Sequence, residues 1–276
     1  MLNEFTETSF DLDRYLSLSG ATKPALFDWS APQPRLDDDA LFALGYMMDI
    51  ESYTVVYLRD LLSTRAIREP AVTAFLSCWV YEELFHSIVL RRFLTSQGVS
   101  IDDGRFAELR THRLIRERMV RPLAAIISRL TRHFPAVHMT WGALNEISTL
   151  TGYAALIDYT ARVGGDDGES SMLAQILRRI IKDERRHFAF YFGQARTRLR
   201  PRAAQRLTNF LLRRFWTPVG SSVRGGDAAR RICSTLFPGA SGRQRLRSID
   251  SAIARLPGLE WFDLATRRCA AAPAAL

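Results

Sequence analysis

Long stretches of hydrophobic residues at helical spacing are the feature of this 276-residue sequence that most constrains its fold. They run over about 37–64, 70–97, 135–164 and 168–200. The first opens at an acidic triplet suited to a helix N-terminus, and the second opens at Pro70 and closes before Gly98, which are typical helix boundaries. The sequence contains no convincing alternating run typical of a β-strand, so it predicts an all-α protein built around a helical bundle.

The remaining segments divide the chain into three parts. Residues 1–36 lack a sustained period and predict an arm that lies over the body of the protein. Residues 37–200 hold the long helices, with a basic amphipathic segment over about 106–132. Residues 201–276 predict a helical extension packed on the bundle, with shorter helices at 202–216, 227–236 and 241–255.

Two of the long helices each carry a Glu-x-x-His motif, Glu83 with His86 and Glu184 with His187. Side chains three positions apart lie on one face of a helix, so each pair can point at one metal ion. Both motifs fall on the apolar stripes that should face the core. A buried carboxylate without a partner is costly, so these glutamates need a metal or a positive group.

The other two long helices each carry one glutamate on an apolar stripe, Glu51 and Glu146. The four helices therefore offer four carboxylates and two imidazoles. Hard oxygen ligands with few imidazoles favour the ferric state and suit O2 chemistry. The alternative to a metal site is a structural role, in which the four glutamates form ion pairs with arginine or histidine.

In this ligand order the sequence resembles the ferritin-like superfamily, and within it the soluble acyl-acyl-carrier-protein desaturases and their bacterial relatives. The resemblance covers about residues 37–200. It implies a ferritin-like four-helix bundle with additional helices. The desaturase pattern Asp-Glu-x-Arg-His is matched at 183–187, and a threonine three residues after the third-helix glutamate is matched by Thr149.

The resemblance also implies roles for individual residues. Two iron ions, with manganese as the alternative, would be held by Glu51, Glu83, His86, Glu146, Glu184 and His187. Asp183 would hydrogen-bond to His86, and by the symmetry of the two motifs we expect Glu82 to do the same for His187. Thr149 would act in catalysis by relaying a proton or holding a water. The alternative is a structural role, in which its hydroxyl donates a hydrogen bond to a carbonyl of its own helix. We expect Gly142 and Gly152 to leave space for a substrate.

Three functional hypotheses follow. The favoured one is an O2-dependent desaturase or hydroxylase of an acyl or similar aliphatic substrate. The second is a related oxygenase of a small metabolite, an aldehyde or a tRNA base, and the third is a non-catalytic iron-binding or peroxide-scavenging protein. Two related families are excluded by single residues. Radical-type ribonucleotide reductases carry a tyrosine where this sequence has Leu90, and arylamine oxygenases carry an additional histidine ligand where it has Ile180. No flavin or ferredoxin motif is present, so electrons should come from a separate donor such as a ferredoxin.

Basic charge is concentrated in the last third of the chain. Residues 196–276 contain 16 arginines and four acidic residues, against a net charge of +9 for the whole sequence. We expect this region to dock an acidic carrier protein, with Arg213 and Arg214 outside and Phe210 and Leu211 packed inward. The alternative is that these arginines reflect the overall amino-acid composition and form a solvated face without a docking role. We do not expect nucleic acid as the partner, and we expect a homodimer.

The composition is that of a soluble globular protein, with 47% hydrophobic and 24% charged residues. The sequence shows no membrane span and no signal peptide, which predicts a cytoplasmic location. Cys78, Cys233 and Cys269 are widely spaced, so we expect reduced, structural thiols. The histidines outside the motifs, His112, His133 and His138, are expected to be ordinary surface or partly buried residues.

Overall fold

The computed structural model of the chain describes residues 12–31, 33–102, 104–111, 122, 125–164 and 171–270. These residues form helices and connecting segments, with no β-strand among them. The all-α class predicted from the sequence is confirmed for this part of the chain. Residues 112–121, 123 and 124 of the basic segment over 106–132 lie outside the described residues.

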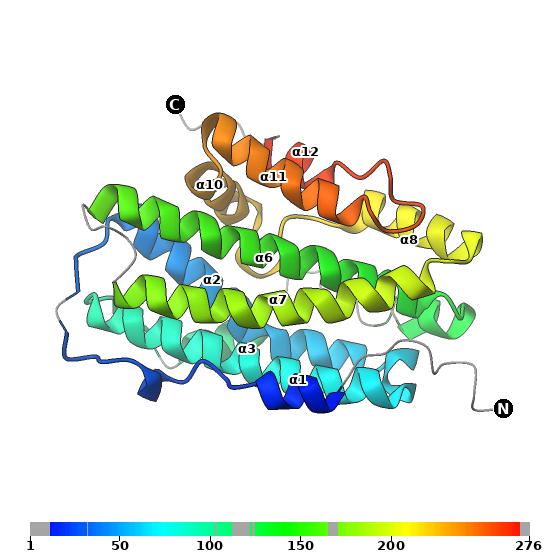
Figure 1. The fold of residues 1–276 in the computed structure, drawn as a ribbon, viewed down its shortest axis with the longest axis horizontal. Coiled ribbons are helices and arrows are strands. Elements are labelled where there is room, and N and C mark those ends of the chain that lie inside the picture. The colour runs from blue at the N-terminus through cyan, green and yellow to red at the C-terminus, as the bar shows by residue number, and fades with distance from the viewer. Residues whose placement is uncertain are drawn as a thin grey trace.

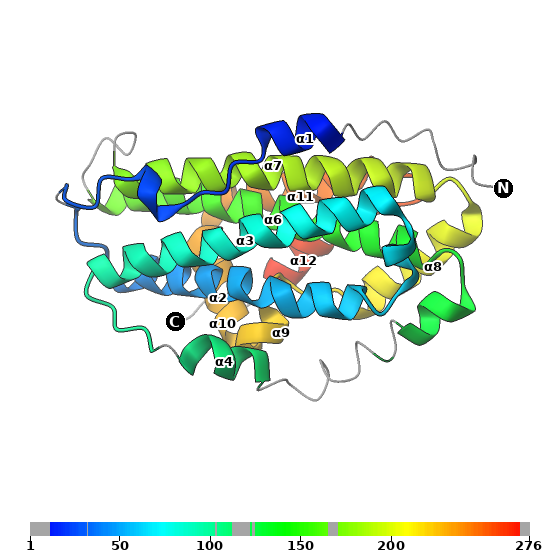
Figure 2. The same cartoon turned by 90° about the horizontal axis from the view of Figure 1, so that it is seen from below.

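Four long helices lie side by side and form the centre of the molecule (Figures 1 and 2). They are α2 (Asp38–Leu61), α3 (Pro70–Ser96), α6 (Phe134–Gly164) and α7 (Met172–Arg198). α2 packs on α3 and α6 on α7, and the two pairs meet through contacts of α3 with α7 and of α2 with α6.

The ends of these helices follow the local sequence. Asp37 caps α2 because its side chain accepts a hydrogen bond from the backbone N–H of Ala40 at 2.8 Å. α3 begins at Pro70, and the chain leaves it at Gly98 with a φ of 84°, a conformation that favours glycine. Ser171 caps α7 by accepting from the N–H of Ala174. The sequence also predicts a turn at 165–168, and these residues lie outside the described part of the chain.

The N-terminal segment runs along the face made by α3 and α7 (Figure 2). Its described part contains α1 (Leu12–Leu18) and a 3-10 turn, η1 (Pro24–Leu26), and both pack against α3. A second 3-10 turn, η2 (Arg65–Arg68), joins α2 to α3. α4 (Gly104–Thr111) packs against α2, and residues 125–130 are also helical.

The C-terminal helices cover the opposite side, over α6 and α2 (Figure 1). They are α8 (Arg202–Phe215), α9 (Ser221–Arg224), α10 (Gly226–Leu236), α11 (Gly239–Ile253) and α12 (Leu264–Ala270). The sequence patterns did not predict α9 and α12. Leu211 is buried as expected, but Phe210 is 61% exposed, so its predicted inward packing is wrong.

Two hydrophobic cores occupy opposite ends of the four long helices. One includes Phe75, Met139 and Tyr191, and the other includes Leu44 and Ile176. On each of the four helices, the residues before and after the candidate ligands belong to different cores. The ligand motifs therefore lie at the level where one apolar core gives way to the other.

Cys233 and Cys269 form a disulfide that links α10 to α12, with their Cα atoms 5.4 Å apart. The expectation of reduced thiols is therefore wrong for this pair, whereas Cys78 is free. The pairing depends on α12 folding back onto α10, which the sequence patterns did not predict. No helix in the described part of the chain combines the length and the apolar composition that crossing a membrane requires.

Candidate functional site

Six buried side chains from the four long helices meet at one place, which we call the carboxylate–histidine cluster: Glu51, Glu83, His86, Glu146, Glu184 and His187. They form two groups of four, and within each group one ligand atom per residue lies within 4.8 Å of the others. Glu83 and Glu184 belong to both groups. The cluster therefore offers two adjacent cation positions that share two carboxylates.

Each histidine turns its Nδ1 atom toward the cluster. The Nδ1 of His86 lies 3.7 Å from an oxygen of Glu51 and 3.5 Å from one of Glu184. The Nδ1 of His187 lies 3.1 Å from Glu83, 3.5 Å from Glu146 and 3.7 Å from Glu184. The Nδ1 atoms are thus the nitrogens available to a metal.

Several of these inward atoms have no hydrogen-bond partner among the described residues. They are Glu83 Oε1, both carboxylate oxygens of Glu184, and the Nδ1 atoms of His86 and His187. Buried polar atoms are rarely left unpaired, because each costs about 1–3 kcal/mol. These atoms point at the same two positions and are the donors that iron, manganese and zinc accept, so the residues fit a pair of metal ions.

The pKa values of two glutamates and both histidines of the cluster lie above their usual values. Burial, reinforced by the charge of Glu51, raises the pKa of Glu83 well above its usual value. Burial and the charge of Glu184 raise the pKa of Glu146. Burial alone would lower the pKa of His86 and His187, but the surrounding carboxylates raise both. The cluster therefore attracts either protons or metal cations.

The outer nitrogen of each histidine is held by a second carboxylate. His86 Nε2 lies 3.1 Å from Asp183, and His187 Nε2 lies 2.7 Å from Glu82. These are the two contacts expected from the sequence. An acid at Nε2 keeps the proton on that nitrogen and leaves Nδ1 as an electron-pair donor.

Arg186 and the N-terminal arm fix these two outer carboxylates. Arg186 donates to Glu82 at 2.6 Å and to Asp183 at 2.8 Å. Tyr15 and Ser19 donate to Glu82 at 2.9 and 2.6 Å. Burial opposes ionisation of Glu82, but its hydrogen bonds, that from His187 first, lower its pKa to about 2.

The arm also reaches the other outer carboxylate, because Thr22 donates to Asp183 at 3.0 Å. Sequence reasoning missed the arm residues. Arg186 stood inside the Asp-Glu-x-Arg-His motif, three residues after Asp183 and therefore on its face of the helix. That spacing could have identified it.

Two aromatic residues orient the carboxylates that belong to only one group. Trp79 donates from its indole N–H to Glu146 at 3.1 Å, and the Tyr153 hydroxyl donates to Glu51. Both rings are buried, with 3% and 0% of their surfaces exposed. Tyr153 is thus both a core aromatic residue and a hydrogen-bond donor to a candidate ligand.

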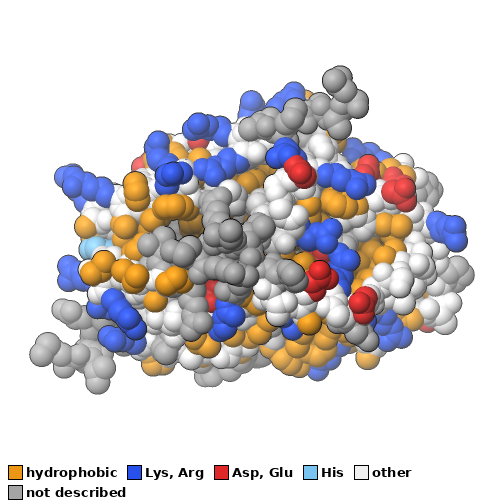
Figure 3. Space-filling view, turned by 180° about the vertical axis from the view of Figure 1, so that it is seen from behind, with side chains coloured by type: hydrophobic (Ala, Val, Ile, Leu, Met, Phe, Trp, Pro, Cys, Tyr) orange, Lys and Arg blue, Asp and Glu red, His pale blue; other side chains and the backbone are white. Residues whose placement is uncertain are grey.

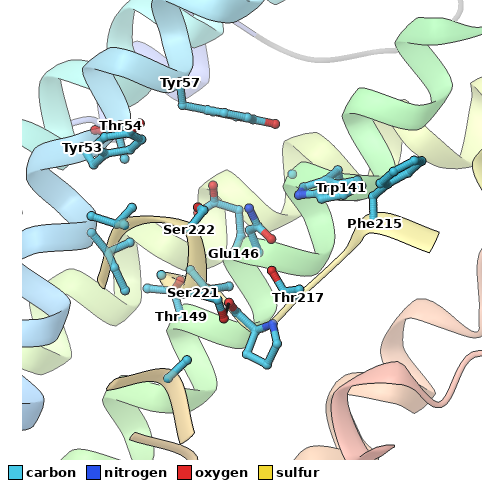
Figure 4. A pocket seen from close by; sticks show the side chains of 18 of the residues that line it. Tyr53, Thr54, Tyr57, Trp141, Glu146, Thr149, Phe215, Thr217, Ser221 and Ser222 are labelled. Carbon is cyan, nitrogen blue, oxygen red and sulfur yellow. Dashed lines mark hydrogen bonds between the residues drawn. The ribbon is translucent and has the colours of Figure 1, made fainter. Parts of the chain in front are cut away.

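A cavity of about 1390 Å³ opens beside the cluster between α2, α6 and the C-terminal segment (Figure 4). The four glutamates of the cluster line it, namely Glu51, Glu83, Glu146 and Glu184. Aromatic residues from α2 and α6 form further wall, with Tyr57 facing Trp141 in Figure 4, while Thr217 and Ser221 lie on the opposite side. Arg213, Arg230, Arg267 and Arg268 also line the cavity. An organic molecule could therefore reach the carboxylates.

Thr149 lies in this cavity, one turn beyond Glu146 on the same helix (Figure 4). Its neighbours Ser148 and Thr151 donate to helix carbonyls at 2.7 and 2.6 Å. No such bond from Thr149 is found among the described residues, so its hydroxyl is available to the cavity.

The expectation that Gly142 and Gly152 leave space for a substrate is wrong for the positions of their missing Cβ atoms, although Gly142 itself lines the cavity. A Cβ atom on Gly142 would lie 2.4 Å from the ring of Tyr191, and one on Gly152 would lie 2.7 Å from Met47. These glycines allow other core side chains to approach the helix closely.

His138 is the second correction within the cavity wall. It was expected at or near the surface, but it is buried, with 3% of its surface exposed, and it lines the cavity. His133 is partly buried as expected, and His112 lies outside the described residues.

Among known proteins, no family model and no curated sequence matches this chain. The function must therefore be argued from the site itself.

Proposed function

We propose that this chain is an O2-dependent di-iron oxidoreductase with a ferritin-like four-helix bundle. The observation that carries the proposal is the convergence of unpaired, buried carboxylate and imidazole atoms on two adjacent positions. Four carboxylates also match the charge of two ferrous ions. The N-terminal arm, 1–36, and the helices of 201–276 would then be additions to a bundle spanning 37–200.

When bound, two iron ions would supply the redox chemistry with O2. Desaturation or hydroxylation of an aliphatic substrate would consume one O2, two electrons and two protons, which requires an external electron donor such as a ferredoxin. Glu82 and Asp183 would hold the two imidazoles, and Arg186 would hold those carboxylates. Thr149, with a hydroxyl open to the cavity, would deliver protons.

The cavity favours an organic substrate over simple iron storage, because a large, partly apolar space adjoins the carboxylates. An acyl chain would occupy this space with its reacting carbons near Glu146 and Thr149. Arginines of the lining, among them Arg213, would meet an anionic headgroup or an acidic carrier protein. Basic side chains lie over much of the face seen in Figure 3, interspersed with hydrophobic ones.

Metal analysis tests the first part of the proposal. Iron-loaded protein should contain two metals per chain, and Glu184→Ala and His86→Ala should lose part or all of that load. Lys182→Ala, an exposed change on the same helix, serves as the control. Wild-type metal content in both ligand variants would refute the assignment.

Turnover tests the second part. Diferrous protein supplied with a ferredoxin-type donor and O2 is offered acyl-carrier substrates, and the products are identified by mass spectrometry. Thr149→Val should keep the metals and slow or uncouple oxidation. Two metals without oxidation of any acyl substrate would favour the iron-binding hypothesis, and co-purified RNA would favour a tRNA substrate.

Carrier docking has its own assay. Binding of an acidic carrier should weaken steeply as salt rises, and reversing Arg213 and Arg214 should weaken it without loss of metal. Arg162→Glu, at the exposed end of α6, is the control because Arg162 does not line the cavity. Salt-independent binding would instead point to a small diffusible substrate.

A further inference from the structure

His138 is a buried polar residue in the cavity wall that the proposed chemistry does not use. It lies on α6, two turns before Glu146, which is about 12 Å along the helix axis. Neither of its ring nitrogens has a hydrogen-bond partner among the described residues. Because an unpaired buried polar atom costs about 1–3 kcal/mol, this arrangement suits a site that a ligand completes.

The surroundings of His138 determine what kind of ligand group it can bind. Tyr57 and Tyr191 hold the imidazole edge to face, with ring centroids at 6.1 and 5.8 Å. Burial lowers the pKa of His138 to about 3, so the ring is neutral and offers one N–H donor and one acceptor nitrogen. A neutral ring gives no charge to balance a carboxylate or an ammonium group.

A hydroxyl group matches this environment. It can donate to one imidazole nitrogen or accept from the other, so it can pair with either of them. The neighbouring lining, with Phe134, Val137 and Trp141, would surround the rest of that part of the ligand with apolar and aromatic surface. A plain saturated chain would leave the imidazole unpaired.

We propose that His138 determines substrate specificity by hydrogen-bonding a hydroxyl group on an otherwise apolar substrate. This deepens the proposed function and rests on it, because it takes the cavity beside the carboxylate–histidine cluster as the substrate site. The hydroxyl lies about two helical turns from the reacting position near Glu146. The substrate class is therefore a hydroxylated acyl chain or a phenol, and the oxidation takes place away from that hydroxyl.

A matched pair of small probes tests the inference without turnover. 4-Ethylphenol and ethylbenzene differ by one hydroxyl, and their affinities for the full chain can be measured by calorimetry. We expect 4-ethylphenol to bind about tenfold more tightly or better, because ethylbenzene leaves the imidazole unpaired. It should also shift the ¹⁵N resonances of the His138 ring, which ethylbenzene should not.

Substitution assigns the difference to one residue. His138→Phe keeps an aromatic ring against Tyr57 and Tyr191, so the variant should fold, and the two probes should then bind within about twofold of each other. His133→Phe is the matched control because His133 does not line the cavity, and it should keep the wild-type preference.

The inference would be overturned by equal affinity of the two probes, by no binding of either at millimolar concentration, or by an unchanged preference in His138→Phe. A His138 ring whose resonances respond to Tyr191→Phe but to neither probe would show an internal pairing, and would also overturn it. These measurements need no iron and no O2. The probe-binding tests can therefore fail while the tests of metal binding and turnover succeed. The tests of metal binding and turnover can likewise fail while the probe-binding tests succeed.

Discussion

Replacing Glu82 with glutamine should weaken metal binding even though Glu82 does not face the metal positions. Its carboxylate accepts hydrogen bonds from Tyr15, Ser19, Arg186 and His187. Glutamine has one oxygen in place of two, and its amide nitrogen cannot accept from an arginine or an imidazole N–H. Arg186 and His187 use different oxygens of Glu82, so the one oxygen of glutamine cannot accept from both, and the proton on His187 Nε2 is held less firmly away from Nδ1.

The expected magnitude follows from comparable outer partners of metal-bound histidines. Their loss typically lowers metal affinity by about 10- to 100-fold, which corresponds to about 1.4–2.7 kcal/mol. The effect should be confined to the position on the His187 side, formed by Glu83, Glu146, Glu184 and His187. Asp183→Asn should produce the same loss on the His86 side, because Asp183 contacts His86 Nε2.

Competition with a chelator measures the two affinities, and the melting temperature of each variant shows that it is folded. Ser19→Ala is the matched control, since it removes one neutral donor to the same carboxylate and should cost threefold or less, about 0.6 kcal/mol. Unchanged affinity at both positions in Glu82→Gln would refute the reasoning. An equal loss in Ser19→Ala would show that packing of the arm, and not the charge of Glu82, governs binding.

Three further outcomes are expected. Reducing the disulfide between Cys233 and Cys269, which are 36 positions apart in sequence, should lower stability by about 4 kcal/mol in denaturant unfolding, and Cys233→Ser should match the reduced protein. The melting temperature of the metal-free protein should fall as pH rises from about 6 to about 8. The raised pKa values of the cluster make the folded state bind more protons than the unfolded chain over this range. The melting temperature of the metal-loaded protein should change less. Gly142→Ala should destabilise the fold by about 1–3 kcal/mol through its clash with Tyr191, whereas Gly45→Ala, with open space at its Cβ, should stabilise it by up to about 1 kcal/mol.

The candidate ligands were predictable because the relevant geometry is local. Glu83 and His86 are three residues apart on an apolar helical stripe, and the same holds for Glu184 and His187. Helical periodicity alone therefore places each pair on one inward face. The long helices were predictable for the same reason, with boundaries at Asp37 and at prolines and glycines.

The arm contacts were not predictable, because they join residues far apart with no local pattern. Tyr15 meets Glu82 across 67 positions, and Thr22 meets Asp183 across 161. His138 was misjudged because a single histidine on an apolar stripe gives no sign of whether it faces solvent, core or cavity. The disulfide was missed because α12, which carries Cys269, was not predicted.

The charges around the cluster favour a metal centre over a set of structural ion pairs. Arg186 pairs with the outer acids Glu82 and Asp183. Among the described residues, none of the ion pairs joins an arginine to the four inner glutamates. The two imidazoles can neutralise at most two of those four carboxylates, and only when both are protonated. Structural pairing would thus leave two buried carboxylates to be protonated, whereas two divalent cations neutralise all four and also use the unpaired Nδ1 atoms.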